Sequence, residues 1–355
     1  MKKIPIIKTV IPGIEVVKLG SPLFAQMELT SECPYQCIFC YNVWKCSDNN
    51  SSKGMTRNQA FFVAEELIRC RVFSVILSGG EPTLKTYLAE LVKYLRENGI
   101  DVIIITNGAL LTEKLLHSLL KAGLQSMQIS MHHFLPEKMN QITENPNSFK
   151  LTLQGIKNAL KICGPEMFNV NMVATKDTVR DIWGMGEFLN RLGVNNFSIG
   201  MVSTCGQAGK NGLVCDNRDL EIAYNQLRGL HLKYGMDVAF TGGLPFCALP
   251  SIDEDFVRMA NVCDAAMSQV VIGPEGNIRP CVGLPDVAGN IFTDDIIQVW
   301  RNSDVLNNIR QFRNTPITCR SCEDVDTCHG GCRASAQTYS GDTLGYDPMM
   351  PERRK

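Results

Sequence analysis

Residues 24–40 read FAQMELTSECPYQCIFC, an apolar stretch that runs directly into three closely spaced cysteines. The apolar half predicts a strand, and Cys33, Cys37 and Cys40 follow it with the spacing C-x3-C-x2-C. Three thiolates on one loop can bind three irons of a cubane iron–sulfur cluster and leave the fourth iron open to a substrate. The same loop can instead bind zinc with Cys46 as a fourth ligand, so the spacing alone leaves both metals open.

Short apolar runs alternate with helical patterns on both sides of this loop. The predicted strands are Phe24–Thr30, Ser74–Leu77, Asp101–Thr106, Ser126–Ser130, Phe168–Ala174 and Asn196–Met201. One intervening helix is marked by apolar residues at helical spacing, namely Leu84, Leu88, Leu91, Val92 and Leu95, and the next is predicted to begin with Thr112 as its N-cap. Six strand–helix units predict a parallel sheet, either open and doubly wound or a partial barrel. In both arrangements, ligands bind at the C-terminal ends of the strands.

Polar residues stand at several of these strand ends. Gly79-Gly80-Glu81-Pro82-Thr83 follows the second strand, Thr106-Asn107-Gly108 ends the third, Ser130 ends the fourth, and Asn171 lies within the fifth. The two glycines allow the backbone to approach a ligand closely, and Glu81 can accept a hydrogen bond from an ammonium group. Each motif alone is also typical of an ordinary turn or cap. Their shared location favours one polar site.

The C-terminal third of the chain carries two further cysteine patterns. Four cysteines lie within fourteen residues as Cys319-x2-Cys322-x5-Cys328-x3-Cys332, and upstream Cys263, Gly276 and Cys281 form the pattern C-x12-G-x4-C. The residues 269–279 between them predict a hairpin with its turn at 273–276. These spacings predict bound metal, and by themselves they leave zinc as an alternative to iron–sulfur clusters.

Composition limits the class of protein. The chain has 355 residues, of which 45% are hydrophobic and 20% charged, so it can form one large α/β domain and a smaller one. A net charge of -1 disfavours nucleic acid as the main partner. Pro5, Lys8 and Pro12 interrupt any signal-peptide core, and no apolar run is long enough for a membrane span. We therefore expect a cytoplasmic protein, in which 15 cysteines indicate metal binding or chemistry rather than disulfides.

The cluster loop, the glycine turn and the Thr106-Asn107-Gly108 strand end together resemble the radical SAM superfamily over residues 24 to about 202. The resemblance implies a partial (β/α)6 TIM-like barrel, with the amine and carboxylate of S-adenosylmethionine (SAM) on the open iron. It also implies that SAM is cleaved reductively to methionine and a 5′-deoxyadenosyl radical that abstracts a substrate hydrogen atom. The residues that it implies for SAM are Gly79, Gly80 and Glu81 at the amino group, Phe39 near adenine, and Asn107, Ser130 and Asn171 at the ribose or carboxylate.

The C-terminal cysteines resemble the SPASM extension, which carries auxiliary 4Fe-4S clusters. The resemblance implies one or two such clusters, the first held by Cys247, Cys263, Cys281 and Cys332 and the second by Cys319, Cys322 and Cys328. The chain departs from the family at Asp347-Pro348-Met349-Met350, where Met350 stands in place of a final cysteine. We hypothesise that the second cluster is retained with an oxygen ligand such as Asp347 or an exchangeable ligand, and loss of that cluster is the alternative.

These patterns divide the chain into four segments. They are an N-terminal extension (1–23), a radical SAM partial barrel (24–203), a bridging segment (204–245) and a SPASM-like domain (246–355). His132 and His133 follow the fourth strand, so they are candidate proton carriers or substrate contacts, although a packing role is the alternative. Cys205 and Cys215 flank a loop near the strand ends, where a catalytic thiol is an option.

The resemblance implies an enzyme that oxidatively modifies a peptide or protein, as in the maturation of ribosomally made peptides. An auxiliary cluster is the expected acceptor of the electron that the substrate radical must lose. The implied partners are a peptide substrate, an electron donor such as flavodoxin or ferredoxin, and a separate leader-peptide-binding protein, without membrane or nucleic acid. Radical chemistry on a small-molecule precursor is the alternative, followed by a metal-binding regulator without turnover.

Overall fold

One long sheet organises the chain in the computed structural model, which describes residues 6–11, 14–42, 54–249, 259–260, 262–310 and 315–352. Across these residues the strand order is β12-β11-β10-β3-β4-β5-β6-β7-β8-β9. The six predicted strands are all present, as β3 (Phe24–Glu28), β4 (Ser74–Ser78), β5 (Asp101–Thr106), β6 (Ser126–Ser130), β7 (Phe168–Ala174) and β8 (Asn196–Met201). They pair in parallel in their order along the chain. Because the order begins at β12 and ends at β9, the sheet forms a partial barrel, as predicted.

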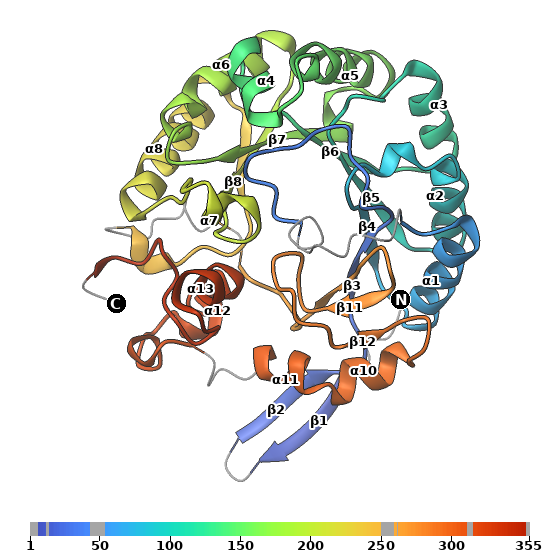
Figure 1. Cartoon of the computed structure of the whole chain (residues 1–355), viewed down its shortest axis with the longest axis vertical. Helices are drawn as coiled ribbons and strands as arrows, with labels where there is room; N and C mark the ends of the chain where they lie inside the picture. Colours follow the sequence, from blue (N-terminus) through green and yellow to red (C-terminus); the bar gives the residue numbers. More distant parts are fainter. Residues whose placement is uncertain are drawn as a thin grey trace.

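Helices cover the outer face of this sheet (Figure 1). They are α1 (Arg57–Arg69), α2 (Leu88–Glu97), α3 (Glu113–Lys121), α4 (Pro136–Thr143), α5 (Ser148–Cys163), α6 (Ile182–Leu192) and α8 (Asn217–Tyr234). Thr112 caps α3 as predicted, since its side chain accepts a hydrogen bond from the amide of Leu115 at 3.2 Å. The predicted apolar face of the preceding helix is buried from Leu88 to Leu95, while Leu84 falls in a separate short 3-10 helix.

A seventh parallel strand lies within the segment that the sequence analysis took as a bridge. This strand is β9 (Asp237–Thr241), which pairs in parallel with β8 after the long helix α8. The short helix α7 (Gln207–Lys210) lies between β8 and α8 in the chain, close to the C-terminal end of β8. Residues 204–241 therefore extend the barrel.

The C-terminal segment joins the same sheet at its other edge. Its predicted hairpin is present as β10 (Gln269–Ile272) and β11 (Asn277–Arg279), followed by β12 (Gly289–Asn290). Because β10 pairs in parallel with β3, the hairpin lies directly beside the strand that leads to the first three cysteines. The remaining helices are α10 (Ile296–Asn302), α11 (Asp304–Arg310), α12 (Val325–Cys328) and α13 (Arg333–Ser340), and they fill the side of the arc between α8 and α1 (Figure 1).

The N-terminal extension forms a two-stranded antiparallel hairpin, β1 (Ile6–Ile11) and β2 (Ile14–Leu19), which projects from the body of the protein (Figure 1). Its end is anchored to α10, because the indole nitrogen of buried Trp300 donates to the carbonyl of Leu19 at 2.8 Å. Within the described ranges, no helix is both long and apolar enough to cross a membrane.

Candidate active site

The loop that carries Cys33, Cys37 and Cys40 is held at the C-terminal end of β3, and we call residues 33–40 the cluster loop. On one side, the amide of Ile38 donates to a carbonyl at the end of α4 at 3.0 Å. On the other side, the amide that begins α7 donates to the carbonyl of Cys40, also at 3.0 Å. All three thiols are partly exposed. The predicted ligands therefore share one anchored loop, whereas Cys46 lies outside the described residues.

The glycine turn after β4 packs against the chain that leads into the cluster loop. A side chain at Gly80 would place its Cβ atom 2.1 Å from the carbonyl oxygen of Glu32, which is too close for any other residue. Gly79 has φ +128°, and a Cβ atom there would lie 2.5 Å from the carbonyl oxygen of Thr30. The amide of Gly80 also donates to this Thr30 carbonyl at 2.6 Å. The two glycines are thus required by the close approach of two backbones.

Glu81 is fully buried behind this turn, and its carboxylate is surrounded by protein donors. One oxygen accepts from the amide and hydroxyl of Thr83 and from the hydroxyl of Thr106 at 2.6 Å. The other accepts from the amide of Asn107 at 2.7 Å. Burial raises the pKa of Glu81, and these hydrogen bonds oppose the rise. The carboxylate therefore joins the ends of β4 and β5, and its predicted contact with SAM remains a prediction.

Asn107 links the end of β5 to the first cysteine of the cluster loop. Its side-chain amide donates to Sγ of Cys33 at 3.6 Å, and its side-chain oxygen accepts from the amide of Ala109 at 2.8 Å. Hydrogen bonds to the sulfurs are one of the means by which proteins tune iron–sulfur clusters. The structure thus brings two predicted site residues together, with Asn107 oriented toward a ligand thiol.

Ser130 and Asn171 are register partners on β6 and β7. The side-chain amide of Asn171 donates to the hydroxyl of Ser198 at 2.9 Å and to that of Thr241 at 3.3 Å. Asn171 therefore organises a polar row that reaches β8 and β9. Contacts of Ser130 and Asn171 with the ribose or carboxylate of SAM stay predictions.

His132 packs against Phe39 of the cluster loop. Their ring centroids lie 4.7 Å apart with an interplanar angle of 84°, an edge-to-face arrangement. Nδ1 of His132 accepts a hydrogen bond from the amide of Val173 at 3.3 Å, so the ring proton resides on Nε2. Burial lowers the pKa of His132 from 6.5 to about 4, and the ring is neutral at pH 7. A neutral imidazole thus forms a wall beside the residue predicted to lie near adenine.

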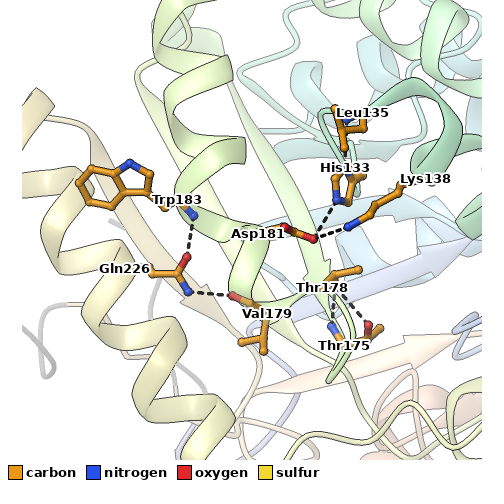
Figure 2. Close-up of polar contacts among 9 residues, drawn as sticks. All are labelled: His133, Leu135, Lys138, Thr175, Thr178, Val179, Asp181, Trp183 and Gln226. Carbon is orange, nitrogen blue, oxygen red and sulfur yellow. Dashed lines mark hydrogen bonds and ion pairs between the residues drawn. The ribbon is translucent and has the colours of Figure 1, made fainter.

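His133 points in another direction and belongs to a polar network between β6 and α6 (Figure 2). Its Nε2 lies 3.1 Å from a carboxylate oxygen of Asp181, which Lys138 also contacts at 2.9 Å. Because Nδ1 accepts from the amide of Leu135, Nε2 carries the proton and donates to Asp181. Burial raises the pKa of Asp181, but hydrogen bonds from Lys138 and His133 lower it overall. His133 therefore fixes the turn after β6.

The C-terminal cysteines gather in two sets. The first contains Cys263, Cys281 and Cys332, which we call the first auxiliary set. Burial raises the pKa of Cys281, and the nearby Cys263 and Cys332 thiols raise it further. The backbone amides of Gly283 and Leu284 oppose this rise and favour the thiolate of Cys281. Three predicted ligands of one cluster are thus brought together, with amide groups beside a sulfur.

The second auxiliary set consists of Cys319, Cys322 and Cys328. Burial raises the pKa of Cys319, and the neighbouring Cys328 and Cys322 thiols add to the rise. The amide of Phe246 donates to Sγ of Cys328 at 3.4 Å. Phe246 begins a short 3-10 helix whose next residue is Cys247. A Cβ atom at Gly243, in the same segment, would lie 2.9 Å from Cβ of Cys263 in the first set. The chain that leads to Cys247 therefore contacts both sets, and the assignment of Cys247 to the first set stays a prediction.

Asp347 and Met350 occupy the region where the family resemblance implies a final cysteine. Asp347 is fully buried, and its two carboxylate oxygens accept from the amides of Cys332 and Met349 at 2.7 and 2.9 Å. Met350 is buried as well. Asp347 therefore shapes the turn that carries Cys332, and its predicted role as an oxygen ligand remains a prediction.

The donor groups of all three sets fit iron–sulfur clusters. No cysteine within the described ranges forms a disulfide. Among those residues, no three His, Cys, Asp or Glu side chains converge closely enough to hold a single metal ion. A cubane cluster is wider than one ion, and its thiolates are commonly stabilised by hydrogen bonds to sulfur. Amide groups of this kind stand beside Cys33, Cys281 and Cys328.

The structure contains a buried ion pair that was not predicted from the sequence. Glu28 at the end of β3 pairs with Arg279 at the end of β11, and both side chains are almost fully buried. The second carboxylate oxygen of Glu28 has no partner among the described residues. Arg279 also donates to the carbonyls of Val282 and Leu284, which follow Cys281 in the chain. A charged residue at the end of an apolar strand was the sequence signal that could have revealed this link.

Comparisons with known proteins agree with this geometry. The radical SAM superfamily model matches residues 27–189, and the SPASM model, an iron–sulfur cluster-binding domain, matches residues 263–323. An AdoMet-dependent heme synthase of Methanosarcina barkeri is 25% identical over 94% of this chain and 97% of its own length. A PqqA peptide cyclase of Bradyrhizobium diazoefficiens is 26% identical over 93% of this chain and 86% of its own length.

A solved structure supports the fold. Streptococcus suis SuiB bound to the precursor peptide SuiA superposes with a TM-score of 0.76 at 21% identity, over 93% of this chain and 76% of SuiB. The superposed length includes both the barrel and the C-terminal cysteine region. This chain is therefore an enzyme of the radical SAM superfamily that carries a C-terminal SPASM-type iron–sulfur domain.

Proposed function

We propose that this enzyme modifies a peptide by a net two-electron oxidation that begins at the cluster loop and ends at an auxiliary cluster. The observation that carries the proposal is the parallel pairing of β3 with β10. The cluster loop follows β3, and Cys281 follows β11 of the same hairpin. One continuous sheet therefore links the proposed electron source to the proposed electron acceptor, which supports transfer of an electron between them.

When bound, the cluster of the cluster loop supplies the electron that cleaves SAM to methionine and a 5′-deoxyadenosyl radical. The residues around it hold the reactants in place. Asn107 donates to the Cys33 sulfur, and the glycine turn packs against the residues that lead into the loop. Phe39 and neutral His132 pack edge-to-face and form an uncharged surface beside the loop. Exclusion of water and of competing hydrogen donors lets the radical reach the substrate C–H group.

A peptide substrate is supported by the relative that is named a PqqA peptide cyclase. The similar AdoMet-dependent heme synthase favours a second candidate, oxidation of a small-molecule precursor. Both candidates need an acceptor for the electron that the substrate radical loses. The SPASM family model covers Cys263 and Cys281, which supports this role for the auxiliary region.

We further propose two auxiliary 4Fe-4S clusters, one in each auxiliary set. The amides beside Cys281 and Cys328 support retention of both. With the cluster at the cluster loop, the reconstituted enzyme should contain about twelve irons per chain, whereas about eight would show that one auxiliary cluster is lost. Reduction requires a low-potential donor such as flavodoxin or ferredoxin. A reducing cytoplasm suits the free thiols, and a separate protein could present the leader of the peptide.

The function is tested by anaerobic incubation of the reconstituted enzyme with SAM, dithionite and short peptides encoded beside its gene. We expect 5′-deoxyadenosine to form and a peptide to lose two hydrogen atoms, as measured by mass spectrometry. A C33A variant is the control and should form neither product. If peptides stay unchanged while a tetrapyrrole precursor is consumed, the peptide proposal is wrong and the small-molecule alternative holds.

A further inference from the structure

A buried cysteine outside every predicted ligand set lies between the cluster loop and the first auxiliary set. Cys205 follows β8 and is 2% exposed. It forms a small buried cluster with Leu284 and Ala334, against which both Cys281 and Cys332 pack. Cys205 also contributes to the electrostatic surroundings of the Cys332 thiol. The small cluster that contains Cys205 therefore adjoins two cysteines of the first auxiliary set.

The loop that carries Cys205 is fastened to α13, whose N-cap residue is Cys332. The hydroxyl of Thr204 donates to the carbonyl of Ser335 at 2.9 Å, and the hydroxyls of Ser203 and Ser335 lie 2.9 Å apart. The hydroxyl of Ser203 also donates to the Cys205 sulfur at 3.0 Å. These contacts hold the loop that carries Cys205 against the auxiliary region.

The chain on the other side leaves room for this sulfur. Gly283 lies two residues after Cys281, and a Cβ atom at Gly283 would be 3.1 Å from the Cys205 sulfur. Any larger residue there would crowd the thiol. The first auxiliary set contains three cysteines, and the chain that leads to Cys247 contacts both Cys263 of this set and Cys328 of the second set. A cubane cluster with four cysteine ligands needs one more thiolate at the first set.

We propose that Cys205 is this fourth ligand, completing a cluster with Cys263, Cys281 and Cys332. The inference rests on the proposed auxiliary cluster of the first set. On binding, the Cys205 thiol loses its proton to solvent and its sulfur bonds to iron. The neighbouring Gly206 lies against Cys40, where a Cβ atom would be 2.2 Å from the Cys40 carbonyl oxygen. One loop thereby connects a ligand of the first auxiliary cluster to the cluster loop.

The test uses the full chain with all three cluster-loop cysteines changed to alanine, so that all bound iron is auxiliary. In this background, C205A is compared with C263A as a positive control and C215A as a matched negative control. Cys215 is an equally buried thiol of the same loop, but its sulfur contacts the carbonyl of Ala174 at 3.6 Å. Iron and sulfide content and the EPR spectrum of the reduced protein are measured. We expect C205A to lose the EPR signal that C263A loses, with about half of the auxiliary iron, and C215A to keep both.

A C205S variant separates ligand loss from misfolding, because its hydroxyl keeps the contacts of the loop. It should change the same EPR signal while unfolding at the temperature found for C215A. Unchanged iron content and EPR spectra in C205A overturn the inference. It is also overturned if C247A loses the EPR signal that C263A loses while C205A keeps it. If the background protein binds no iron, the auxiliary clusters and the inference both fail. That result leaves the proposed cleavage of SAM untouched, because SAM cleavage is measured with the enzyme whose cluster loop is intact.

Discussion

His132 shows at the scale of a single residue how burial sets chemistry near the candidate site. Its ring is 6% exposed, packs edge-to-face on Phe39 and accepts a hydrogen bond from the amide of Val173. Because no opposite charge compensates for burial, the pKa of His132 falls to about 4. A histidine in this state can donate from Nε2, but it cannot act as a cationic acid at neutral pH.

This shift predicts a pH-dependent loss of stability. Between pH 6.5 and pH 4 the unfolded chain binds a proton at His132 that the folded protein does not, so stability falls as the pH is lowered through this range. The loss at pH 5 relative to pH 7 should be about 2 kcal/mol. An H132N variant retains an acceptor for the Val173 amide at the position of Nδ1 but lacks the titration. Urea unfolding of the metal-free proteins at both pH values should show the smaller pH-dependent loss in H132N, and equal losses would contradict the assigned pKa.

The turn between β4 and the 3-10 helix at Pro82–Leu84 shows how an element is specified by backbone contact. Gly80 faces the carbonyl of Glu32, while the amide of Glu81 donates to that same carbonyl at 2.8 Å. The Glu81 carboxylate then caps the 3-10 helix and holds the end of β5. The position of the cluster loop thus depends on a turn that has no room for a Cβ atom.

A G80A variant should therefore displace the residues that lead into the cluster loop. We expect loss of most SAM-dependent change in the EPR spectrum, with the auxiliary signals retained, because the displaced carbonyl of Glu32 lies next to Cys33. G99A is the matched control, since Gly99 has φ +73° and a Cβ atom there meets nothing within 4 Å. That substitution should cost about 1 kcal/mol of backbone strain and leave the spectra unchanged. An unaltered SAM response in G80A would show that the turn tolerates the added methyl group.

At the scale of the whole molecule, one set of contacts joins the barrel to the SPASM-type domain. This joint consists of the β3–β10 pairing together with the buried pair of Glu28 and Arg279. Burial raises the pKa of Glu28 to about 7, and Arg279 opposes the rise. Arg279 in turn donates to the carbonyl of Val282, next to Cys281. The pair therefore fixes the first auxiliary set relative to the cluster loop.

Removal of one member of this pair should be costly. R279M leaves the Glu28 carboxylate buried without its cation, and the free energy of unfolding should fall by about 3–5 kcal/mol. The double variant E28M/R279M should be less destabilised than the sum of the single variants. The exposed pair of Arg57 and Glu90, 2.9 Å apart, serves as control, since R57M should change stability by only about 0–1 kcal/mol. Urea unfolding is measured for the unmodified protein, E28M, R279M, E28M/R279M and R57M, and additive losses would show that Glu28 and Arg279 do not stabilise each other.

The sequence alone determined the elements and the chemistry of the first site. Alternating apolar runs located β3 to β8 nearly to the residue, because strand and helix periods are local properties of the chain. The spacing of Cys33, Cys37 and Cys40 indicated a cluster loop, and the family model for residues 27–189 agrees. The glycines were also visible, although their reason, the close passage of residues 30–32, was not.

Tertiary structure decided which distant groups meet. β9 was missed because the segment after β8 was taken as a loop and a single helix, and only pairing with β8 reveals the strand. The directions of His132 and His133 could not be read from their adjacent positions, since one packs on Phe39 and the other binds Asp181. Which cysteines belong to the same ligand set depends most on the tertiary fold. Spacing groups cysteines that are close in sequence. The buried cluster that contains Cys205, by contrast, packs against Cys281 and Cys332 only because the fold brings three separate segments together.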